Sequence, residues 1–220
     1  MQVIISGTGT ARRYPGAGPA APVGCRSTVG PMRVIAGEAR GRALRAPAGT
    51  RTRPTADRVR GAVFNMLGSQ LDLDGAVVLD LFAGSGALGI EALSRGAAAA
   101  DFVDNDGAAR RAVAGNLAAT GLGDRGRVRP GDATSERLLA DLAAAVPDGH
   151  YDVAFCDPPY AFDGWDGLLA ALPARWLVVE SDREVPLPSP WEVVRAKRYG
   201  STVVVLARRD VPGGWRAEQE

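Results

Sequence analysis

Short apolar runs and alanine-rich stretches alternate along most of this 220-residue chain. From residue 76 onwards, the apolar runs predict buried strands and the stretches between them predict helices. The predicted strands lie at 76–81, 99–103, 127–129, 152–156, 176–180, 191–195 and 202–207, and the predicted helices at 87–95, 107–120, 134–145 and 164–172. Strands that are apolar throughout and alternate with helices are typical of a parallel sheet covered on both faces. The short connection between the last two strands predicts that one of them runs antiparallel.

A smaller basic unit precedes the sheet, at residues 32–70. Weak alternation and two glycines predict a β-hairpin over 33–46. A helix should then begin after Thr55, which is a good N-cap residue. Its apolar stripe consists of Val59, Val63, Met66 and Leu67. We expect Arg58 and Arg60 to lie off this stripe.

Both ends of the chain differ in composition from the rest. Residues 1–31 are dominated by Gly, Pro, Ala, Ser and Thr without apolar periodicity, which predicts a disordered tail. An open alternative is that translation starts at Met32 and that 1–31 is a misassigned extension. The domain that carries the sheet is expected at 71–210, and 211–220 is expected to be a second tail.

The overall composition is that of a globular protein, with 46% hydrophobic and 23% charged residues. These values exclude wholesale disorder, collagen and coiled coil. The two cysteines have no framework spacing, no Cys/His cluster suggests a metal site, and no apolar run approaches the ~20 residues of a membrane span. The N-terminus also lacks the apolar stretch of a secretory signal. We therefore expect a cytoplasmic protein that does not contact a membrane.

The charges are distributed unevenly along the chain. Residues 1–68 contain 11 Arg and 2 acidic residues, a formal charge of +9, whereas residues 69–220 contain 15 basic and 23 acidic residues, a formal charge of −8. A basic first third joined to an acidic body indicates a polyanionic partner for the first part and a different task for the second. Arg outnumbers Lys by 25 to 1, which suits phosphate recognition but is explained equally well by genomic base composition.

A glycine-rich loop follows the first predicted strand, in the stretch Asp80-Leu-Phe-Ala-Gly-Ser-Gly86. Glycines there allow a sharp turn and a close approach of the backbone to a ligand, and the next helix offers its N-terminus. Asp104 ends the second strand, where an acidic residue can accept hydrogen bonds from ribose hydroxyls. Together with Gly89, the loop also satisfies the dinucleotide fingerprint, so the loop alone does not identify its ligand.

Two features argue against a nicotinamide cofactor at this loop. Hydride transfer usually needs a proton donor or acceptor with a pKa near neutrality. The only His and the only Lys, His150 and Lys197, lie away from the strand ends above the loop. The carboxylate of Asp80 would also repel a pyrophosphate, whereas it could fix the loop or meet a cationic group.

The fourth predicted strand ends in Asp157-Pro-Pro-Tyr160. Ligands of open α/β sheets bind beyond the carboxyl ends of the strands, so this turn should lie beside the glycine loop. The prolines leave carbonyl acceptors without donors, Asp157 adds another acceptor, and this combination suits an exocyclic NH2 group. Tyr160 offers a face on which a base can stack. Cys156 also permits thiolate attack on a cytosine ring, but no Lys or His is near to lower its pKa, which favours packing.

These two motifs resemble the cofactor and amino-methylation motifs of class I S-adenosylmethionine-dependent methyltransferases. More narrowly, the N-terminal signature of the RsmD family, bacterial small-subunit ribosomal RNA guanine-N2 methyltransferases, resembles Arg33-Val-Ile-Ala-Gly37, Gly41-Arg42, Arg53-Pro-Thr55, Asp57-Arg-Val-Arg60 and Phe64-Asn65. The resemblance covers residues 32–209. Gly61 departs from the expected pattern, in which Glu stands at this position, and Gly inside a helix costs about 1 kcal/mol relative to Ala.

The resemblance implies a Rossmann-like α/β fold with a seven-stranded, mostly parallel sheet, helices on both faces and an antiparallel last strand. It also implies methyl transfer from S-adenosylmethionine to N2 of a guanine in 16S ribosomal RNA. The implied cofactor-binding residues are Asp80, Phe82, Ala83, Gly84, Ser85, Gly86, Asp104, Asn105, Asp132, Ala133 and Asp157. The implied catalytic residues are Asp157, Pro158, Pro159 and Tyr160. The implied RNA-binding residues are Arg33, Arg40, Arg42, Arg53, Arg58, Arg60 and Asn65.

Within this set, the resemblance places Asp104 at the cofactor's ribose and Asp132 at its adenine. It suggests a small-subunit assembly particle as substrate, and we expect a monomer. Three alternatives stay open: a DNA amino-methyltransferase acting on adenine N6 or another amine, a nicotinamide-dependent oxidoreductase, and a non-catalytic RNA-binding protein. The chain leaves no room for a separate target-reading domain, which argues against DNA, and the intact motif at 157–160 argues against a non-catalytic protein.

Overall fold

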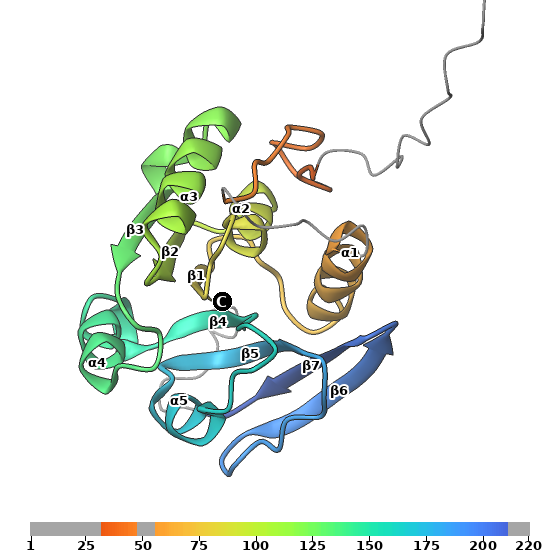
Figure 1. The fold of residues 1–220 in the computed structure, drawn as a ribbon, viewed down its shortest axis with the longest axis vertical. Coiled ribbons are helices and arrows are strands. Elements are labelled where there is room, and N and C mark those ends of the chain that lie inside the picture. The colour runs from red at the N-terminus through yellow and green to blue at the C-terminus, as the bar shows by residue number, and fades with distance from the viewer. Residues whose placement is uncertain (1–31, 48–55, 211–220) are drawn as a thin grey trace, which may run out of the picture.

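The computed structural model describes residues 32–47 and 56–210 of the chain (Figure 1). The predicted tails at 1–31 and 211–220, and with them Arg53 and Thr55, lie outside the described residues. No helix within the described ranges has the length and apolar character needed to cross a membrane. The same ranges contain no group of three or more His, Cys, Asp or Glu residues that could hold a metal ion.

Seven strands form one sheet, in the spatial order β3-β2-β1-β4-β5-β7-β6. Their bounds are β1 Val77–Leu81, β2 Ala99–Asp104, β3 Gly126–Pro130, β4 Tyr151–Cys156, β5 Ala174–Ser181, β6 Glu192–Tyr199 and β7 Thr202–Arg208. Strands β1 to β5 are parallel, whereas β7 lies between β5 and β6 and runs antiparallel to both. The seven-stranded, mostly parallel sheet with an antiparallel last strand is therefore confirmed.

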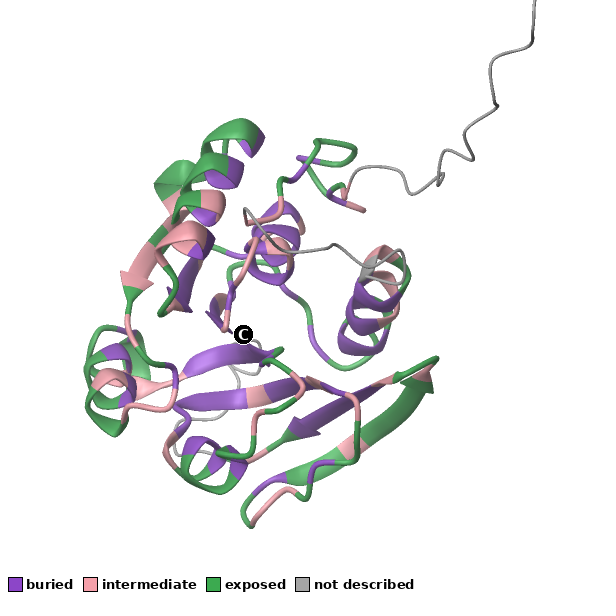
Figure 2. Cartoon of the chain, viewed as in Figure 1, coloured by how far each residue is buried: buried purple, intermediate pink, exposed green. Residues whose placement is uncertain are grey.

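Helices cover both faces of this sheet, as predicted. Their bounds are α1 Ala56–Leu67, α2 Ala87–Ser94, α3 Gly107–Thr120, α4 Glu136–Ala144 and α5 Trp165–Ala171, with short 3₁₀ helices at Gly123–Arg125 and Pro147–Gly149. Helices α1, α2 and α3 bury apolar residues in the core on one face, and α4 and α5 bury theirs on the other. The central strands are buried almost throughout, which explains why the sequence shows them as continuous apolar runs (Figure 2).

The predicted hairpin at 33–46 is reduced to one isolated antiparallel bridge between Arg33 and Ala43. Gly37 and Gly41 both have positive φ angles, 81° and 82°, so the chain turns instead of extending into a ladder. This segment packs directly on α2, because a Cβ atom added to Gly37 would lie 1.7 Å from the carbonyl oxygen of Ser94. Only glycine allows the two backbones to approach this closely.

A buried carboxylate fixes the same segment to the sheet domain. Glu91 on α2 is fully buried and accepts hydrogen bonds from the backbone N–H groups of Ile35, at 2.7 Å, and Ala36, at 3.0 Å. Its carboxylate also lies 2.8 Å from Nε of Arg95 and 3.7 Å from Nε of Arg60. Apolar residues of 32–70 and of the sheet domain share one hydrophobic core, so the two predicted units pack as one body.

The prediction that Arg60 lies off the buried face of its helix is wrong. Only 3% of this residue is exposed, and it pairs with Asp57 at 3.0 Å, donates to the carbonyl of Arg33 and faces Glu91. Apolar periodicity did not reveal it because the partner carboxylate belongs to another helix. The predicted stripe, Val59, Val63, Met66 and Leu67, is buried as expected, and Arg58 is exposed.

Candidate functional site

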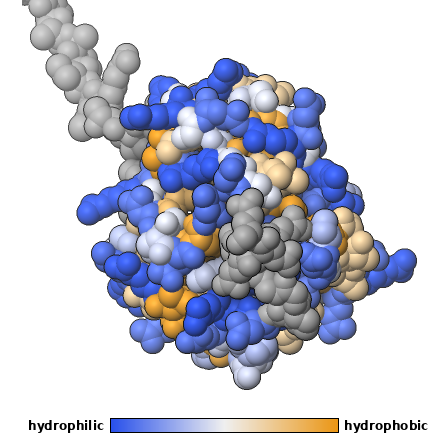
Figure 3. Space-filling view, turned by 180° about the vertical axis from the view of Figure 1, so that it is seen from behind, coloured by the Kyte–Doolittle hydropathy of each residue, from blue (hydrophilic) through white to orange (hydrophobic). Residues whose placement is uncertain are grey.

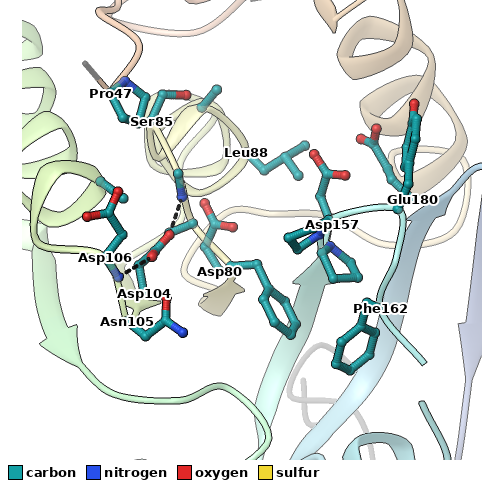
Figure 4. A pocket seen from close by; sticks show the side chains of 18 of the residues that line it. Pro47, Asp80, Ser85, Leu88, Asp104, Asn105, Asp106, Asp157, Phe162 and Glu180 are labelled. Carbon is teal, nitrogen blue, oxygen red and sulfur yellow. Dashed lines mark hydrogen bonds between the residues drawn. The ribbon is translucent and has the colours of Figure 1, made fainter. Parts of the chain in front are cut away.

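A cavity of about 1010 Å³ opens above the carboxyl ends of the parallel strands (Figure 4). The loops after β1, β2, β3 and β4 line it, together with the end of β5 and parts of α1 and α2. The lining residues are Pro47, Val59, Asp80, Phe82, Ala83, Gly84, Ser85, Ala87, Leu88, Asp104, Asn105, Asp106, Ala109, Asp132, Thr134, Asp157, Pro158, Pro159, Tyr160, Ala161, Phe162, Glu180 and Thr202. The glycine loop and the Asp157–Tyr160 turn therefore face one cavity, as predicted.

The glycine loop has an unusual backbone that brings it against Asp104. Phe82, Gly84 and Gly86 have φ angles of 57°, 55° and 75°, and a left-handed conformation at a residue other than glycine, such as Phe82, is rare. The turn directs the N–H of Gly84 to Oδ2 of Asp104 at 2.8 Å. The other oxygen of Asp104 accepts the N–H of Asp106 at 2.8 Å. Each carboxylate oxygen has a second lone pair, so Asp104 can still accept a ribose hydroxyl.

Asp80 fixes the start of α2 from below the loop. It is 2% exposed and accepts the N–H of Gly89 at 2.9 Å. Burial raises the pKa of Asp80 to about 8; the hydrogen bond from Gly89 opposes this shift, and the negative charges of Asp157 and Asp104 add to it. A cation in the cavity would favour the ionised form of this carboxyl, so the site is prepared for positive charge.

The Asp157–Tyr160 turn is held rigidly, although not in the way expected. The carbonyl of Pro159 accepts the N–H of Phe162 at 2.8 Å, so this carbonyl is already used within the turn. Arg183 donates to the carbonyl of Tyr160 at 2.7 Å and to that of Phe162. The carboxylate of Asp157 and the carbonyl of Pro158 are therefore the acceptors that the motif can offer to an amine.

Phe162 is a site residue that the sequence did not single out. Its ring packs against Phe82 of the glycine loop, with centroids 5.2 Å apart, and against Trp165, with centroids 5.0 Å apart. The contact joins the two loops that line the cavity. In the sequence, only its position two residues after Tyr160 could have indicated that this aromatic residue belongs to the site.

Glu180 is a second residue that the sequence did not single out. Val179 pairs with Cys156 in neighbouring parallel strands, so Glu180, near the end of β5, lies level with Asp157, which follows β4. Burial raises the pKa of Glu180 to about 8; the charge of Asp157 raises it further, Arg60 opposes the shift, and Asp80 adds slightly to it. The sequence could have indicated Glu180, because it is a charged residue at the carboxyl end of an apolar predicted strand.

The predicted site residues differ in where they lie: most line the cavity, some are buried and others are exposed to solvent. All predicted catalytic and cofactor-binding residues line the cavity except Gly86 and Ala133, which are buried behind it. Asp132 accepts hydrogen bonds from the backbone and hydroxyl of Thr134, which lower its pKa. Among the predicted RNA-binding residues, the exposed ones are Arg33, Arg40, Arg42, Arg58 and Asn65.

The cavity is strongly acidic. Six carboxyl groups line it, Asp80, Asp104, Asp106, Asp132, Asp157 and Glu180, and no Lys, Arg or His is among its described lining residues. Asp80 and Glu180, whose pKa values are raised to about 8, ionise more readily when a cation is bound. Such a site attracts a cation and repels a pyrophosphate. Cys156 packs in the core, as expected, and burial raises the pKa of its thiol, which disfavours the reactive thiolate.

Comparison with known proteins agrees with this geometry. The family model described as "Conserved hypothetical protein 95" matches residues 32–208. The Bacillus subtilis protein named putative rRNA methyltransferase YlbH is 42% identical over 188 residues, which cover 81% of this chain and 99% of the relative. The Escherichia coli K12 protein named ribosomal RNA small subunit methyltransferase D is 37% identical over 194 residues, which cover 84% of this chain and 93% of the relative.

Solved structures show the same fold. The structure named putative methyltransferase yhhF from Escherichia coli superposes with a TM-score of 0.68 at 35% identity, over 82% of this chain and 99% of that chain. A putative methyltransferase complexed with SAH, SMU.776, shares the fold at 14% identity and a TM-score of 0.53, over 71% of this chain and 50% of that chain. The chain has the Rossmann-like fold of class I methyltransferases and belongs to the RsmD family, which the conserved hypothetical protein 95 model represents.

Proposed function

We propose that this protein transfers a methyl group from S-adenosylmethionine to the exocyclic N2 of a guanine in small-subunit ribosomal RNA. The observation that carries the proposal is the single acidic cavity that contains both the glycine loop and the Asp157–Tyr160 turn. The names of the relatives from Bacillus subtilis and Escherichia coli support ribosomal RNA as the substrate.

The residues of the cavity fit this cofactor. When bound, S-adenosylmethionine supplies a methyl group on a positively charged sulfonium, which an acidic cavity attracts. The volume of about 1010 Å³ is at the upper end of ligand pockets, roughly 300–1,000 Å³, so a second ligand has room beside the cofactor. Asp104 and Asp132 would hold the adenosine part, and Gly84 and Ser85 would lie against the amino-acid part. The same carboxylates argue against a nicotinamide dinucleotide.

The Asp157–Tyr160 turn would orient the reacting amine. Asp157 and the carbonyl of Pro158 accept the hydrogens of N2, while the ring of Tyr160 stacks on the base. These acceptors would direct the lone pair of N2 toward the methyl group that a bound S-adenosylmethionine would supply, and the proton that N2 releases would pass to water. Holding both reactants in line supplies much of the rate.

The basic N-terminal unit would hold the RNA around this cavity. The exposed arginines Arg33, Arg40 and Arg42 lie on the segment that leads to Pro47 at the cavity, and Arg58 lies on α1, whose Val59 forms part of the cavity wall. Phosphate contacts there would position the RNA. The target guanine must be in a loop or flipped out of its stack to enter the cavity.

A cytoplasmic monomer acting on a small-subunit assembly particle is the setting that we propose. Among the described residues, Val193 is the one large hydrophobic side chain that is exposed. The face shown in Figure 3 is largely hydrophilic, with only scattered hydrophobic residues. Stable self-association usually needs a broad exposed apolar surface, so both observations support a monomer.

Methyl transfer to small ribosomal subunits tests the proposal. The subunits come from a strain that lacks its own N2-guanine methyltransferase, the cofactor carries a labelled methyl group, and the digested nucleosides are identified by mass. We expect N2-methylguanosine from the RNA and no label in duplex DNA. Label in DNA adenine, or tight binding of NADH with none of S-adenosylhomocysteine, would refute the proposal.

A further inference from the structure

We propose that Glu180 is a specificity-determining residue, which selects guanine by accepting a hydrogen bond from N1–H while Asp157 accepts from N2. This inference rests on the proposed function and extends it to the choice of base. The motif at 157–160 accounts only for an amine, and adenine and cytosine carry amines too. A second group beside Asp157 is needed to distinguish the bases.

The strand register places Glu180 where this second contact is required. Cys156 and Val179 are partners in adjacent parallel strands, so Asp157 and Glu180 are the next residues at the same level, on strands about 4.8 Å apart. Figure 4 shows both side chains on the same side of the cavity, opposite Asp104 and Asp106. One side of the cavity therefore suits the cofactor, and the other presents two carboxyl groups to the base.

Two neighbouring carboxyl groups match the hydrogen-bonding edge of guanine. Guanine presents the N1–H and the N2 amine next to each other, which are donors that need two acceptors. Adenine presents its amine next to N1, which is itself an acceptor. The N1–H of guanine favours the ionised form of Glu180, whereas N1 of adenine repels that form. Cytosine likewise presents an acceptor, N3, next to its amine. The pair of Asp157 and Glu180 therefore favours guanine over both.

The surroundings of Glu180 indicate that its carboxyl group is free for a ligand. The residue is half-buried, and its carboxyl group makes no hydrogen bond or close ion pair with another described residue. The charged groups that face it are Asp157 after β4, Asp80 on β1 and Arg60 on α1, and burial with the two acids outweighs the arginine. A buried carboxyl group without a partner costs stability, which a hydrogen bond from the base would recover.

Base preference in two variants tests this role. The target guanine is first mapped in the RNA, and matched substrates carry guanine or adenine there. E180A should lower kcat/KM for guanine by about 10- to 100-fold, because a hydrogen bond to a carboxylate is lost. E180Q is isosteric and its amide can donate to N1 of adenine, so the guanine-to-adenine preference should fall at least tenfold. Neither change should alter the Kd of S-adenosylhomocysteine by more than about threefold.

The matched control is E184Q, which changes an exposed glutamate that does not line this cavity. It should keep the rate and base preference of the unmodified protein. Glu180 variants that behave like E184Q, with unchanged rates on both substrates, would overturn the inference while leaving the proposed function intact. Unmodified protein that forms no N2-methylguanosine would overturn the proposed function and this inference with it.

Discussion

Replacing Glu91 with alanine should detach the N-terminal unit from the sheet domain. This fully buried carboxylate accepts the N–H groups of Ile35 and Ala36 and faces the guanidinium groups of Arg60 and Arg95. The change leaves Arg60, which is 3% exposed, without its buried counter-charge. It also leaves two backbone donors without their acceptor in a part of the structure with little access to water.

The size of the effect follows from these lost contacts. Removing one partner of a buried ion pair costs about 3–5 kcal/mol, and each unsatisfied donor adds about 1–3 kcal/mol unless water reaches it. We therefore expect the free energy of unfolding to fall by at least ~3 kcal/mol. In a domain of this size, such a loss lowers Tm by roughly 10 °C.

Denaturant unfolding and amide hydrogen exchange measure the two parts of this effect. The amides of Ile35 and Ala36 should lose protection, while those of the central strands should keep theirs below the transition. The control is Glu38→Ala, which removes an exposed ion pair with Arg125 and should cost no more than about 1 kcal/mol. If E91A and E38A are equally stable and exchange alike, the buried network does not anchor the N-terminal unit.

Three further experiments separate catalysis, electrostatics and RNA binding. Asp157→Ala should lower methyl transfer by more than about 100-fold while keeping the affinity for S-adenosylhomocysteine within a few-fold; unchanged turnover would remove Asp157 from the reaction. Because the pKa of Asp80 is about 8 in the folded protein and near 4 when unfolded, only the folded state holds this proton between those pH values. Its contribution to stability therefore falls as pH rises from 4 to 8, and Asp80→Asn should flatten that decline in unfolding measured at pH 5 and pH 8; an equal decline in both proteins would contradict the raised pKa. Arg58→Ala should reduce the slope of log K against log salt for RNA binding by about one unit, whereas Arg60→Ala should mainly lower Tm; an unchanged slope for Arg58→Ala would place the phosphate contact elsewhere.

The sequence predicted the sheet well because its signals are local. The central strands are short apolar runs between glycines or polar residues, and burial on both faces keeps these runs uninterrupted. Most boundaries are correct to within two residues, although β6 extends to Tyr199. That extension is missed because β6 is an edge strand with mostly exposed, polar residues such as Arg195 and Lys197.

The residues that the sequence misjudged depend on partners far away in the chain. Arg60 is buried because it faces Glu91, which lies on another helix. The sequence of α1 alone does not show this contact. Glu180 belongs to the site because β5 lies next to β4, which places it beside Asp157. The motifs identified the amine site from adjacent residues, whereas the second carboxyl group required knowledge of strand register.

Helix α1 has a role on each of its two sides. Arg58 faces solvent, whereas the next residue, Val59, forms part of the cavity wall, and adjacent residues of a helix are separated by a rise of only 1.5 Å. Under the proposed function, a change in this helix that moves its RNA contacts would also move part of the cavity wall. The same helix would then couple the binding of the target to the shape of the reaction site.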